Sequence, residues 1–267
     1  MTESKKRLKL GIALGSGGFL GFSHVGVLKV LEKNNLKPEY VAGSSIGAIV
    51  GACYALNPSV KNLEKEMYKL RRFDFIKMLA LANPKVSLIS GKKIRKYLVS
   101  LMGDKLFSDT KIPLKIIAAD LVSGKEIVFK HGKIIDAVMA SMSIPGIFPP
   151  VQMGEKILVD GGLLNPTPVN RVREMGADVV IGVDLTMDRV RFNKLNMFGI
   201  LFRSFDILRT QNTKSVLPED NKRFIIIRPN TEKLQTFQIH DTKKFVKEGE
   251  RVAKKKLEII KKAMGAD

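Results

Sequence analysis

Short apolar runs and amphipathic stretches alternate along this chain, and glycine clusters stand at several of the junctions. Residues 8–14 carry a charge only at Lys9 and predict a buried strand. The run breaks at a glycine-rich loop, residues 15–21, and apolar residues then recur at helical spacing from Val25 to Leu36. This order predicts a strand, a glycine loop and a helix.

A second segment repeats the pattern around a serine. A short extended stretch ends at Tyr40 and Val41, and a charge-free run rich in alanine and branched aliphatic residues continues to Leu56. Between them stands the sequence Gly43-Ser44-Ser45-Ile46-Gly47. The pattern predicts a strand, a sharp turn and a buried helix.

The alternation continues and sets the expected fold class. Strand signals recur in residues 113–119, 126–130, 156–159, 178–184 and 223–228. Helical signals occur in residues 60–110, 134–141, 167–175 and 242–263. We therefore expect a three-layer α/β/α architecture with a mainly parallel central sheet. One domain is expected over residues 1–267, with residues 190–267 packed on it as a helical and strand extension.

The balance of charge points to an anionic partner. Lysine and arginine number 46 against 26 acidic residues, which gives a formal net charge of +20. The positive electrostatic field of such a surface would attract an anionic membrane, a nucleic acid or an acidic small substrate. The simplest explanation of the charge, however, is a lysine-rich solvated surface. A nucleic-acid partner is not expected, because aromatic stacking platforms and a recognisable motif are missing.

Cysteine content and hydropathy bound the cellular context. Cys53 is the only cysteine, which excludes an intrachain disulfide. No apolar run approaches the roughly 20 residues of a membrane-spanning helix. The expected location is the cytoplasm, with peripheral contact at the inner face of the membrane.

The serine turn has the spacing of a nucleophile elbow, with a glycine two positions before and after Ser45. Side chains at Gly43 or Gly47 would collide where the helix folds back past the strand. The spacing selects Ser45 rather than Ser44 as the exposed hydroxyl, and the N–H of Ile46 at the helix start can donate to an oxyanion. The alternative is a small-residue turn that serves only close packing.

The glycine loop also admits two uses. A dinucleotide site needs G-x-G-x-x-G and an acidic residue at the end of the next strand, but that strand ends at Gly43. A set of free N–H groups that holds an oxyanion would instead cooperate with the serine turn. His24, three residues beyond Gly21, is expected to hydrogen-bond the loop and hold its shape. A Ser-His-Asp triad is therefore not supported.

Two further stretches carry open alternatives. Residues 156–159 lead into Asp160-Gly161-Gly162, where the aspartate either reaches another side chain or caps the next segment. The apolar cluster of residues 73–81, beside lysines, is either an interfacial segment or a core helix. No cluster with metal-ligand spacing is visible, so no metal is expected.

Taken together, these motifs resemble the patatin-like phospholipase family in its compact bacterial form. The glycine loop with its following helix, the serine turn, the proline-rich residues 143–150 and Asp160-Gly161-Gly162 match four family motifs in order. The match spans about residues 8–184, and the ordered combination is far more specific than any single motif. The chain departs from the family pattern at Leu20, where arginine or lysine is usual, and at Ser16, where glycine is common.

The resemblance implies a patatin-like variant of the α/β-hydrolase-type architecture with a Ser45–Asp160 dyad. The N–H groups of Gly17, Gly18 and Ile46 would form the oxyanion hole. The glycines that support the motifs are Gly15, Gly21, Gly43, Gly47, Gly161 and Gly162. The implied reaction is hydrolysis of fatty-acyl esters of phospholipids or lysophospholipids through an acyl-enzyme, with no cofactor. The dyad predicts a desolvated Asp160 hydrogen-bonded directly to Ser45.

Two alternatives stay open beside this interpretation. The same dyad could act on other esters, thioesters or peptide bonds, because pocket length decides the substrate. Leu20 could instead mark a weakened site in a basic lipid-binding module. An anionic membrane is the expected partner beside the lipid substrate, and the sequence leaves the oligomeric state open.

Overall fold

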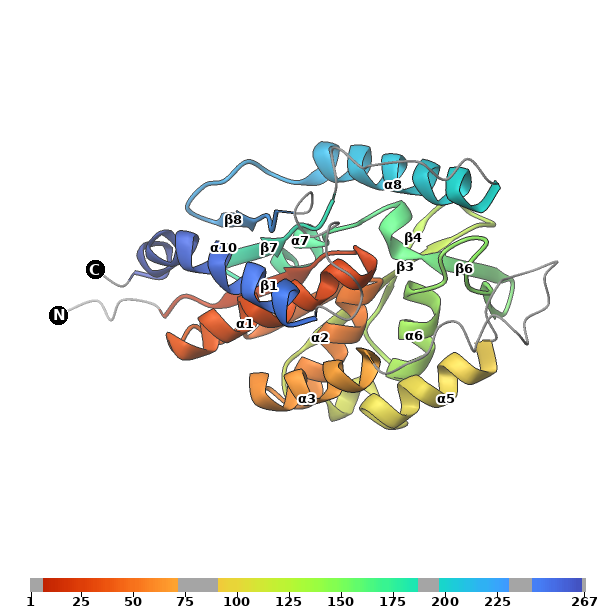
Figure 1. Ribbon diagram of the computed structural model, residues 1–267, viewed down its shortest axis with the longest axis horizontal. Helices are drawn as coiled ribbons and strands as arrows, with labels where there is room; N and C mark the ends of the chain where they lie inside the picture. The colour runs from red at the N-terminus through yellow and green to blue at the C-terminus, as the bar shows by residue number, and fades with distance from the viewer. Residues whose placement is uncertain (1–6, 72–90, 187–196, 231–241, 266–267) are drawn as a thin grey trace.

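The structure, a computed structural model, describes residues 7–71, 91–186, 197–230 and 242–265 (Figure 1). Its centre is an eight-stranded sheet with the order β5-β6-β3-β2-β1-β7-β8, in which β4 pairs with β3. The strands are β1 (Leu10–Leu14), β2 (Tyr40–Ser44), β3 (Leu114–Asp120), β4 (Glu126–Phe129), β5 (Val151–Met153), β6 (Lys156–Asp160), β7 (Val179–Val183) and β8 (Phe224–Ile227). β3, β2, β1, β7 and β8 are parallel neighbours, which confirms the mainly parallel sheet.

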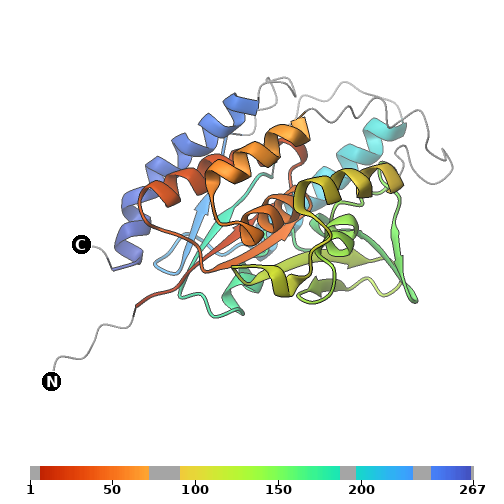
Figure 2. The same cartoon turned by 90° about the horizontal axis from the view of Figure 1, so that it is seen from below.

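Helices cover both faces of the sheet. One layer contains α1 (Phe22–Lys33), α2 (Ile46–Leu56), α3 (Val60–Arg71), α5 (Gly91–Met102), α6 (Ile134–Ser141) and α10 (Thr242–Ala263). The other contains α7 (Val169–Arg173) and α8 (Met197–Val216). Single 3₁₀ turns are η1 (Gly18–Gly21), η2 (Phe107–Asp109) and η3 (Gly161–Leu163). Figures 1 and 2 show α8 on the side of the sheet opposite α1, α3 and α5.

Alternating side chains of each central strand fill two separate cores. In β1, Leu10, Ile12 and Leu14 join the large core beneath α1 and α2, whereas Ala13 faces the smaller core beneath α7. This follows from the two-residue period of a strand, because successive side chains point to opposite faces. Both faces of β1 and β7 are buried, which explains why their sequences read as continuous apolar runs.

The carboxyl ends of β2 and β6 meet on one edge of β3. β4 pairs with the opposite edge, where Ile117 lies across from Val128 and Ala118 from Ile127. On the shared edge, β2 runs parallel to β3 as far as Ser44, and antiparallel β6 continues the edge with Asp160. Since these two residues pair with neighbouring positions of β3, the sheet brings the segments that follow them together.

The residues past 190 belong to the same sheet and its helical layers. β8 pairs with β7 at the sheet edge, and α10 packs along α1. The two helices touch through glycines, because a Cβ on Gly26 would lie 2.0 Å from the carbonyl oxygen of Val246 and one on Gly249 would lie 2.0 Å from that of Ser23. This contact anchors α10 on the helix that follows the glycine loop.

Most predicted elements match the structure, and four details differ. The helical signal expected to continue to residue 110 ends at Met102 in α5. The helix expected over residues 167–175 is confined to Val169–Arg173, because Pro166 and Pro168 precede it and Pro168 is its N-cap. β5 follows the proline-rich stretch, where no strand was expected. Leu36 lies beyond the end of α1 and packs against the large core. The apolar cluster of residues 73–81 lies outside the described residues.

Candidate active site

Ser45 stands at the turn between β2 and α2 in a strained backbone conformation. Its φ of 56° and ψ of −123° lie in a region that residues with a side chain rarely adopt. Ser45 is the N-cap of α2, and its own N–H donates to Ser141 Oγ over 2.9 Å. The predicted strand, sharp turn and helix are therefore present around Ser45.

The glycines of the motifs lie where backbones meet. A Cβ on Gly15, Gly43, Gly47 or Gly161 would stand 1.9–2.5 Å from a backbone oxygen. For Gly47 that oxygen belongs to Leu14, at the end of β1. Real Cβ atoms do not approach so closely, so each of these positions requires glycine for packing.

The end of β6 places Asp160 against Ser45. Ser45 Oγ donates to Asp160 Oδ2 over 2.5 Å, and the N–H of Gly162 donates to Asp160 Oδ1 over 2.7 Å. Asp160 is fully buried and Ser45 is 5% exposed. The expected desolvated aspartate with a direct hydrogen bond to Ser45 is thus confirmed. The aspartate also caps η3 through Gly162, so both uses considered for it occur together.

Burial sets the protonation of this carboxyl group. Removal from water raises the pKa of Asp160 from 3.8 to about 6, against the opposing effects of the Ser45 and Gly162 hydrogen bonds and of the Arg209 cation. An aspartate with this pKa is a stronger base than an exposed one and is still ionised at neutral pH. The pair can therefore transfer a proton from Ser45 to Asp160.

The glycine loop lies over the start of α2. A Cβ on Gly21 would lie 2.3 Å from Ile46 Cγ1, so loop and elbow are in direct contact. The loop is tied to the sheet by the N–H groups of Gly15 and Ser16, which donate to the carbonyls of Val183 and Pro166. By contrast, the loop and turn hydrogen bonds of the described residues give no acceptor to the N–H groups of Gly17, Gly18 and Ile46. These donors are available for an oxyanion.

His24 holds the loop, as its position predicted. Its Nε2 lies 2.8 Å from the carbonyl oxygen of Gly15, and the ring is fully buried. Since a carbonyl oxygen can only accept, Nε2 carries the proton. Burial lowers the pKa of His24 to about 4, so the ring is neutral at physiological pH. It contributes shape to the loop rather than a base for Ser45.

Leu20 lies in the large core. It is 7% exposed, and its carbonyl oxygen accepts a hydrogen bond from Ser23 Oγ over 2.6 Å. The position that departs from the family pattern therefore serves packing in this chain.

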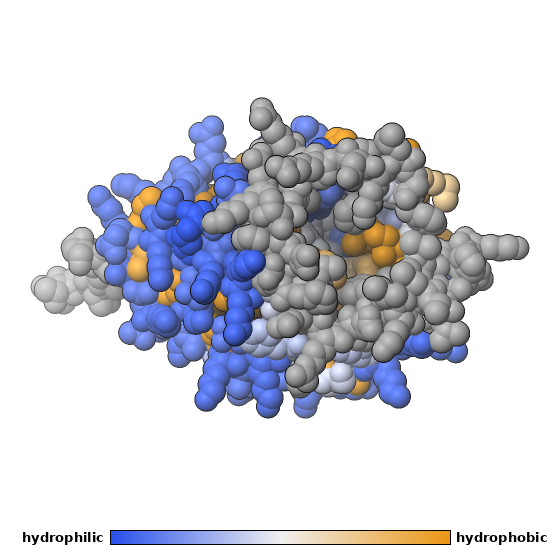
Figure 3. All heavy atoms as spheres, in the orientation of Figure 1, coloured by the Kyte–Doolittle hydropathy of each residue, from blue (hydrophilic) through white to orange (hydrophobic). Residues whose placement is uncertain are grey.

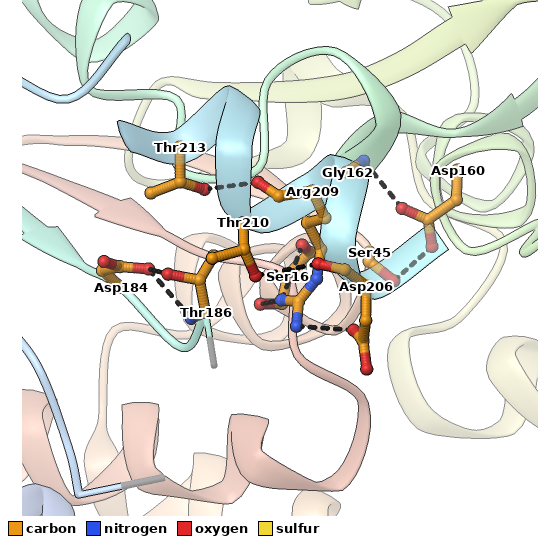
Figure 4. A network of polar contacts seen from close by, with 10 residues as sticks. All are labelled: Ser16, Ser45, Asp160, Gly162, Asp184, Thr186, Asp206, Arg209, Thr210 and Thr213. Atoms are coloured by element: carbon orange, nitrogen blue, oxygen red, sulfur yellow. Dashed lines mark hydrogen bonds and ion pairs between the residues drawn. The ribbon is translucent and has the colours of Figure 1, made fainter. Parts of the chain in front are cut away.

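Sequence reasoning missed two charged residues that lie beside the loop. Arg209 and Asp206, one turn apart on α8, form a buried ion pair of 2.9 Å with 2% and 6% of their side chains exposed (Figure 4). Arg209 Nη1 also donates to the carbonyl oxygen of Ser16 over 2.5 Å and lies 3.3 Å from Ser16 Oγ. The available signal was a carboxylate and an arginine three residues apart in a stretch otherwise rich in apolar residues.

Other functional features are limited in the part of the chain that the structure describes. A hollow of about 1070 Å³ is lined by residues such as Leu36, Lys37, Lys111 and Met264 and includes neither Ser45 nor Asp160. Among the described residues no group of histidine, cysteine, aspartate and glutamate could hold a metal ion. None of the described helices is long and apolar enough to cross a membrane.

Comparisons with known proteins point to one family. A family model described as patatin-like phospholipase matches residues 12–172, more than half of the chain. An uncharacterised NTE family protein of Mycobacterium bovis is 31% identical over 180 residues, which cover 66% of this chain and 49% of that protein. The lysophospholipase NTE1 of Debaryomyces hansenii is 30% identical over 205 residues, covering 74% of this chain and 13% of that protein. This chain thus spans half or less of the length of these relatives.

A solved structure shares the fold. VipD from Legionella pneumophila aligns with a TM-score of 0.54 at 13% identity, covering 94% of this chain and 67% of that one. At this identity the likeness concerns the arrangement of the sheet and its helices.

Proposed function

Because this chain belongs to the patatin-like phospholipase family, we propose that it is a serine acyl hydrolase in which Ser45 and Asp160 hydrolyse fatty-acyl esters of phospholipids or lysophospholipids. The hydrogen bond of 2.5 Å between Ser45 Oγ and the buried Asp160 carboxylate carries this proposal. It joins a strained nucleophile candidate to a base whose pKa is about 6, next to unpaired N–H donors.

The proposed reaction proceeds in two halves. Ser45 Oγ attacks the ester carbonyl carbon while its proton moves to Asp160 Oδ2. The N–H groups of Gly17, Gly18 and Ile46 stabilise the tetrahedral oxyanion, each donor contributing roughly 3 kcal/mol. As the intermediate collapses, Asp160 returns the proton to the leaving alcohol and an acyl-enzyme remains.

Water completes the cycle. Asp160 takes a proton from a water molecule that attacks the acyl carbon, and the same donors stabilise the second oxyanion. Collapse of this intermediate releases the fatty acid, and Ser45 Oγ regains its proton from Asp160. No cofactor takes part in this proposal.

A lysophospholipid is one of the two substrate classes proposed, and the relatives support it. The Debaryomyces hansenii relative is named a lysophospholipase. A broader preference for other esters or thioesters is the competing proposal, because the same dyad would serve them. A basic lipid-binding module without catalysis is the alternative from another class.

We also propose that the protein works in peripheral contact with an anionic lipid surface, on the cytoplasmic face of a membrane. The formal net charge of +20 supports it, and hydrophilic side chains gather over α10 at the left of Figure 3. α8 adds an apolar face, because five large side chains are 46–65% exposed: Met197, Ile200, Leu201, Ile207 and Leu208. A helix with several exposed apolar side chains is typical of binding at a membrane interface.

Fatty-acid release from mixed phospholipid and lysophospholipid vesicles tests the catalytic proposal. Ser45→Ala and Asp160→Asn are expected to reduce release by at least about a thousandfold, because each removes a group that acts as a unit with the other. Ser44→Ala is the matched control, since Ser44 Oγ is buried beside the elbow without a hydrogen-bond partner. It should retain most of the activity.

Labelling with a serine-reactive fluorophosphonate separates the enzyme from the binding module. The wild type and Ser44→Ala should be labelled, and Ser45→Ala should not. A folded wild type that neither reacts with the probe nor releases fatty acid from vesicles or short-chain esters would overturn the proposed hydrolase.

A further inference from the structure

The inner face of α8 is unusually polar for a helix that covers a sheet. Asp206, Arg209, Thr210 and Thr213 are buried, whereas apolar residues of the same helix face outward. Thr210 and Thr213 hydrogen-bond back to the helix carbonyls of Asp206 and Arg209. The ion pair of Asp206 and Arg209 is different, because its arginine also reaches outside the helix to the glycine loop.

Burying an arginine at this depth is costly unless it has a specific partner. The guanidinium group of Arg209 bonds Asp206 through Nη2 and the carbonyl oxygen of Ser16 through Nη1. Ser16 precedes the proposed oxyanion donors Gly17 and Gly18, so the contact fixes the entry to the loop. Asp206 alone would satisfy the charge, and the bond to Ser16 is therefore the feature that needs a functional explanation.

The same contact approaches the proposed base. A Cβ on Gly162 would lie 2.7 Å from Ser16 Oγ and 2.9 Å from Asp160 Oδ1, so both oxygens face this glycine. Figure 4 shows Arg209 beside Ser16, to the left of the Ser45–Asp160 pair. The cation therefore stands near the reacting pair without touching it.

We propose that Arg209 is a positioning residue of this hydrolase: from α8 it holds Ser16, and with it the glycine loop, in register with the Ser45–Asp160 pair. This inference rests on the proposed function. It assigns helix α8, which carries no recognisable motif, a direct part in building the active site.

The cation also has an electrostatic consequence. Arg209 lowers the pKa of Asp160 and so opposes part of the effect of burial. Asp206 screens that cation through their ion pair. His24, on the other side of the loop, is neutral because its pKa is about 4, and Asp120 at the end of β3 is bound to Ser123 and the N–H of Val122 in its own turn. Arg209 is thus the charged side chain whose replacement is expected to move the pKa of Asp160, and Asp206 would act on that pKa through Arg209.

The pH profile of kcat/KM for a short-chain p-nitrophenyl ester tests the proposal. Proton uptake by Asp160 requires its ionised form, so the wild-type rate should rise with pH through about 6. Arg209→Met removes the cation and should move the midpoint upward by about half a unit to one unit. Its loss of activity should therefore be several-fold greater at low pH than on the alkaline plateau.

Asp206→Asn gives a shift of opposite sign. It keeps the cation and removes the counter-charge, so the midpoint should move downward. Arg209→Lys keeps a positive charge but loses the planar guanidinium group, which bonds Asp206 and Ser16 at the same time. The kcat/KM of this variant and the midpoint of its pH profile should lie between those of the wild type and Arg209→Met. If Arg209→Met does not fold, the Asp206→Asn and Arg209→Lys profiles decide the question.

A matched arginine elsewhere controls for the loss of an ion pair. Arg251 pairs with Glu248 at the same spacing on α10, and Arg251→Met should leave the pH profile at the wild-type position. A folded Arg209→Met that keeps the wild-type kcat/KM on the alkaline plateau would overturn this inference while leaving the hydrolase intact. A wild type without Ser45-dependent hydrolysis would overturn the proposed function and this inference with it.

Discussion

Asp160 illustrates, at the scale of one residue, how a buried carboxyl group lowers stability at neutral pH. It is fully buried, and its pKa of about 6 exceeds the 3.8 of an exposed aspartate. The folded protein therefore binds a proton more tightly than the unfolded chain. Stability from this group is fully present below about pH 4 and is lost as pH rises through about 6.

Asp160→Asn should consequently raise the free energy of unfolding while it abolishes activity. In asparagine Oδ1 can still accept from the Gly162 N–H, Nδ2 in place of the other oxygen can donate to Ser45 Oγ, and the side chain carries no charge to bury. At pH 7 we expect a gain of up to about 3 kcal/mol, which should vanish near pH 4. Urea unfolding at the two pH values measures it. An equal effect of the substitution at both pH values would contradict the assigned cost of the buried charge.

At the scale of elements, the site depends on how closely α2 approaches β1. Gly47 lies in the first turn of α2, against the carbonyl oxygen of Leu14 at the end of β1. The peptide of Leu14 is held by its sheet neighbours on both sides and cannot retreat. The elbow geometry of Ser45 is therefore maintained by a backbone contact rather than by a side chain.

Gly47→Ala should destabilise the protein by at least about 2 kcal/mol and displace Ser45, because its Cβ would stand 1.9 Å from the Leu14 oxygen. Gly51→Ala, one turn further along α2, is the matched control. Its Cβ would meet only side chains, first Val41 Cγ1 at 3.1 Å, and alanine favours the helix. We expect a change within about 1 kcal/mol by urea unfolding and retained labelling. Similar losses in both variants would argue against the backbone contact.

At the scale of the whole molecule, charge and apolar surface occupy different helices. The exposed lysines of α10 include Lys243, Lys247 and Lys254, and α8 presents its apolar residues on the other side of the sheet. Surface charges attract anionic lipid over a distance that salt controls, about 10 Å at 0.1 M and about 3 Å at 1 M. Apolar insertion is not weakened in this way.

Vesicle flotation should therefore resolve the two contributions. Binding to anionic vesicles should exceed binding to zwitterionic ones and should fall when salt is raised from about 0.1 M to about 1 M. Charge reversal at Lys243, Lys247 and Lys254 should weaken the salt-sensitive part, whereas Ile200→Ser with Leu208→Ser should weaken the part that persists in salt. Equal binding to both vesicle types at low salt would remove the proposed anionic surface.

The sequence alone determined the local features, because each is encoded over a few neighbouring residues. Apolar alternation and glycine spacing located the elbow at Ser45, the loop before His24 and the strand that ends at Asp160. These patterns reflect period, turn geometry and close packing, which act over short distances along the chain.

Only the tertiary structure decided what those features do together. Ser45 and Asp160 are 115 positions apart and meet because β2 and β6 share one edge of β3. Arg209 lies 193 positions from Ser16, and its spacing from Asp206 along the chain does not reveal which loop it contacts. The cost of burial and the direction of a pKa shift likewise depend on which groups surround a side chain in space. Long-range pairing and desolvation are properties of the folded chain, and they turned separate motifs into one candidate active site.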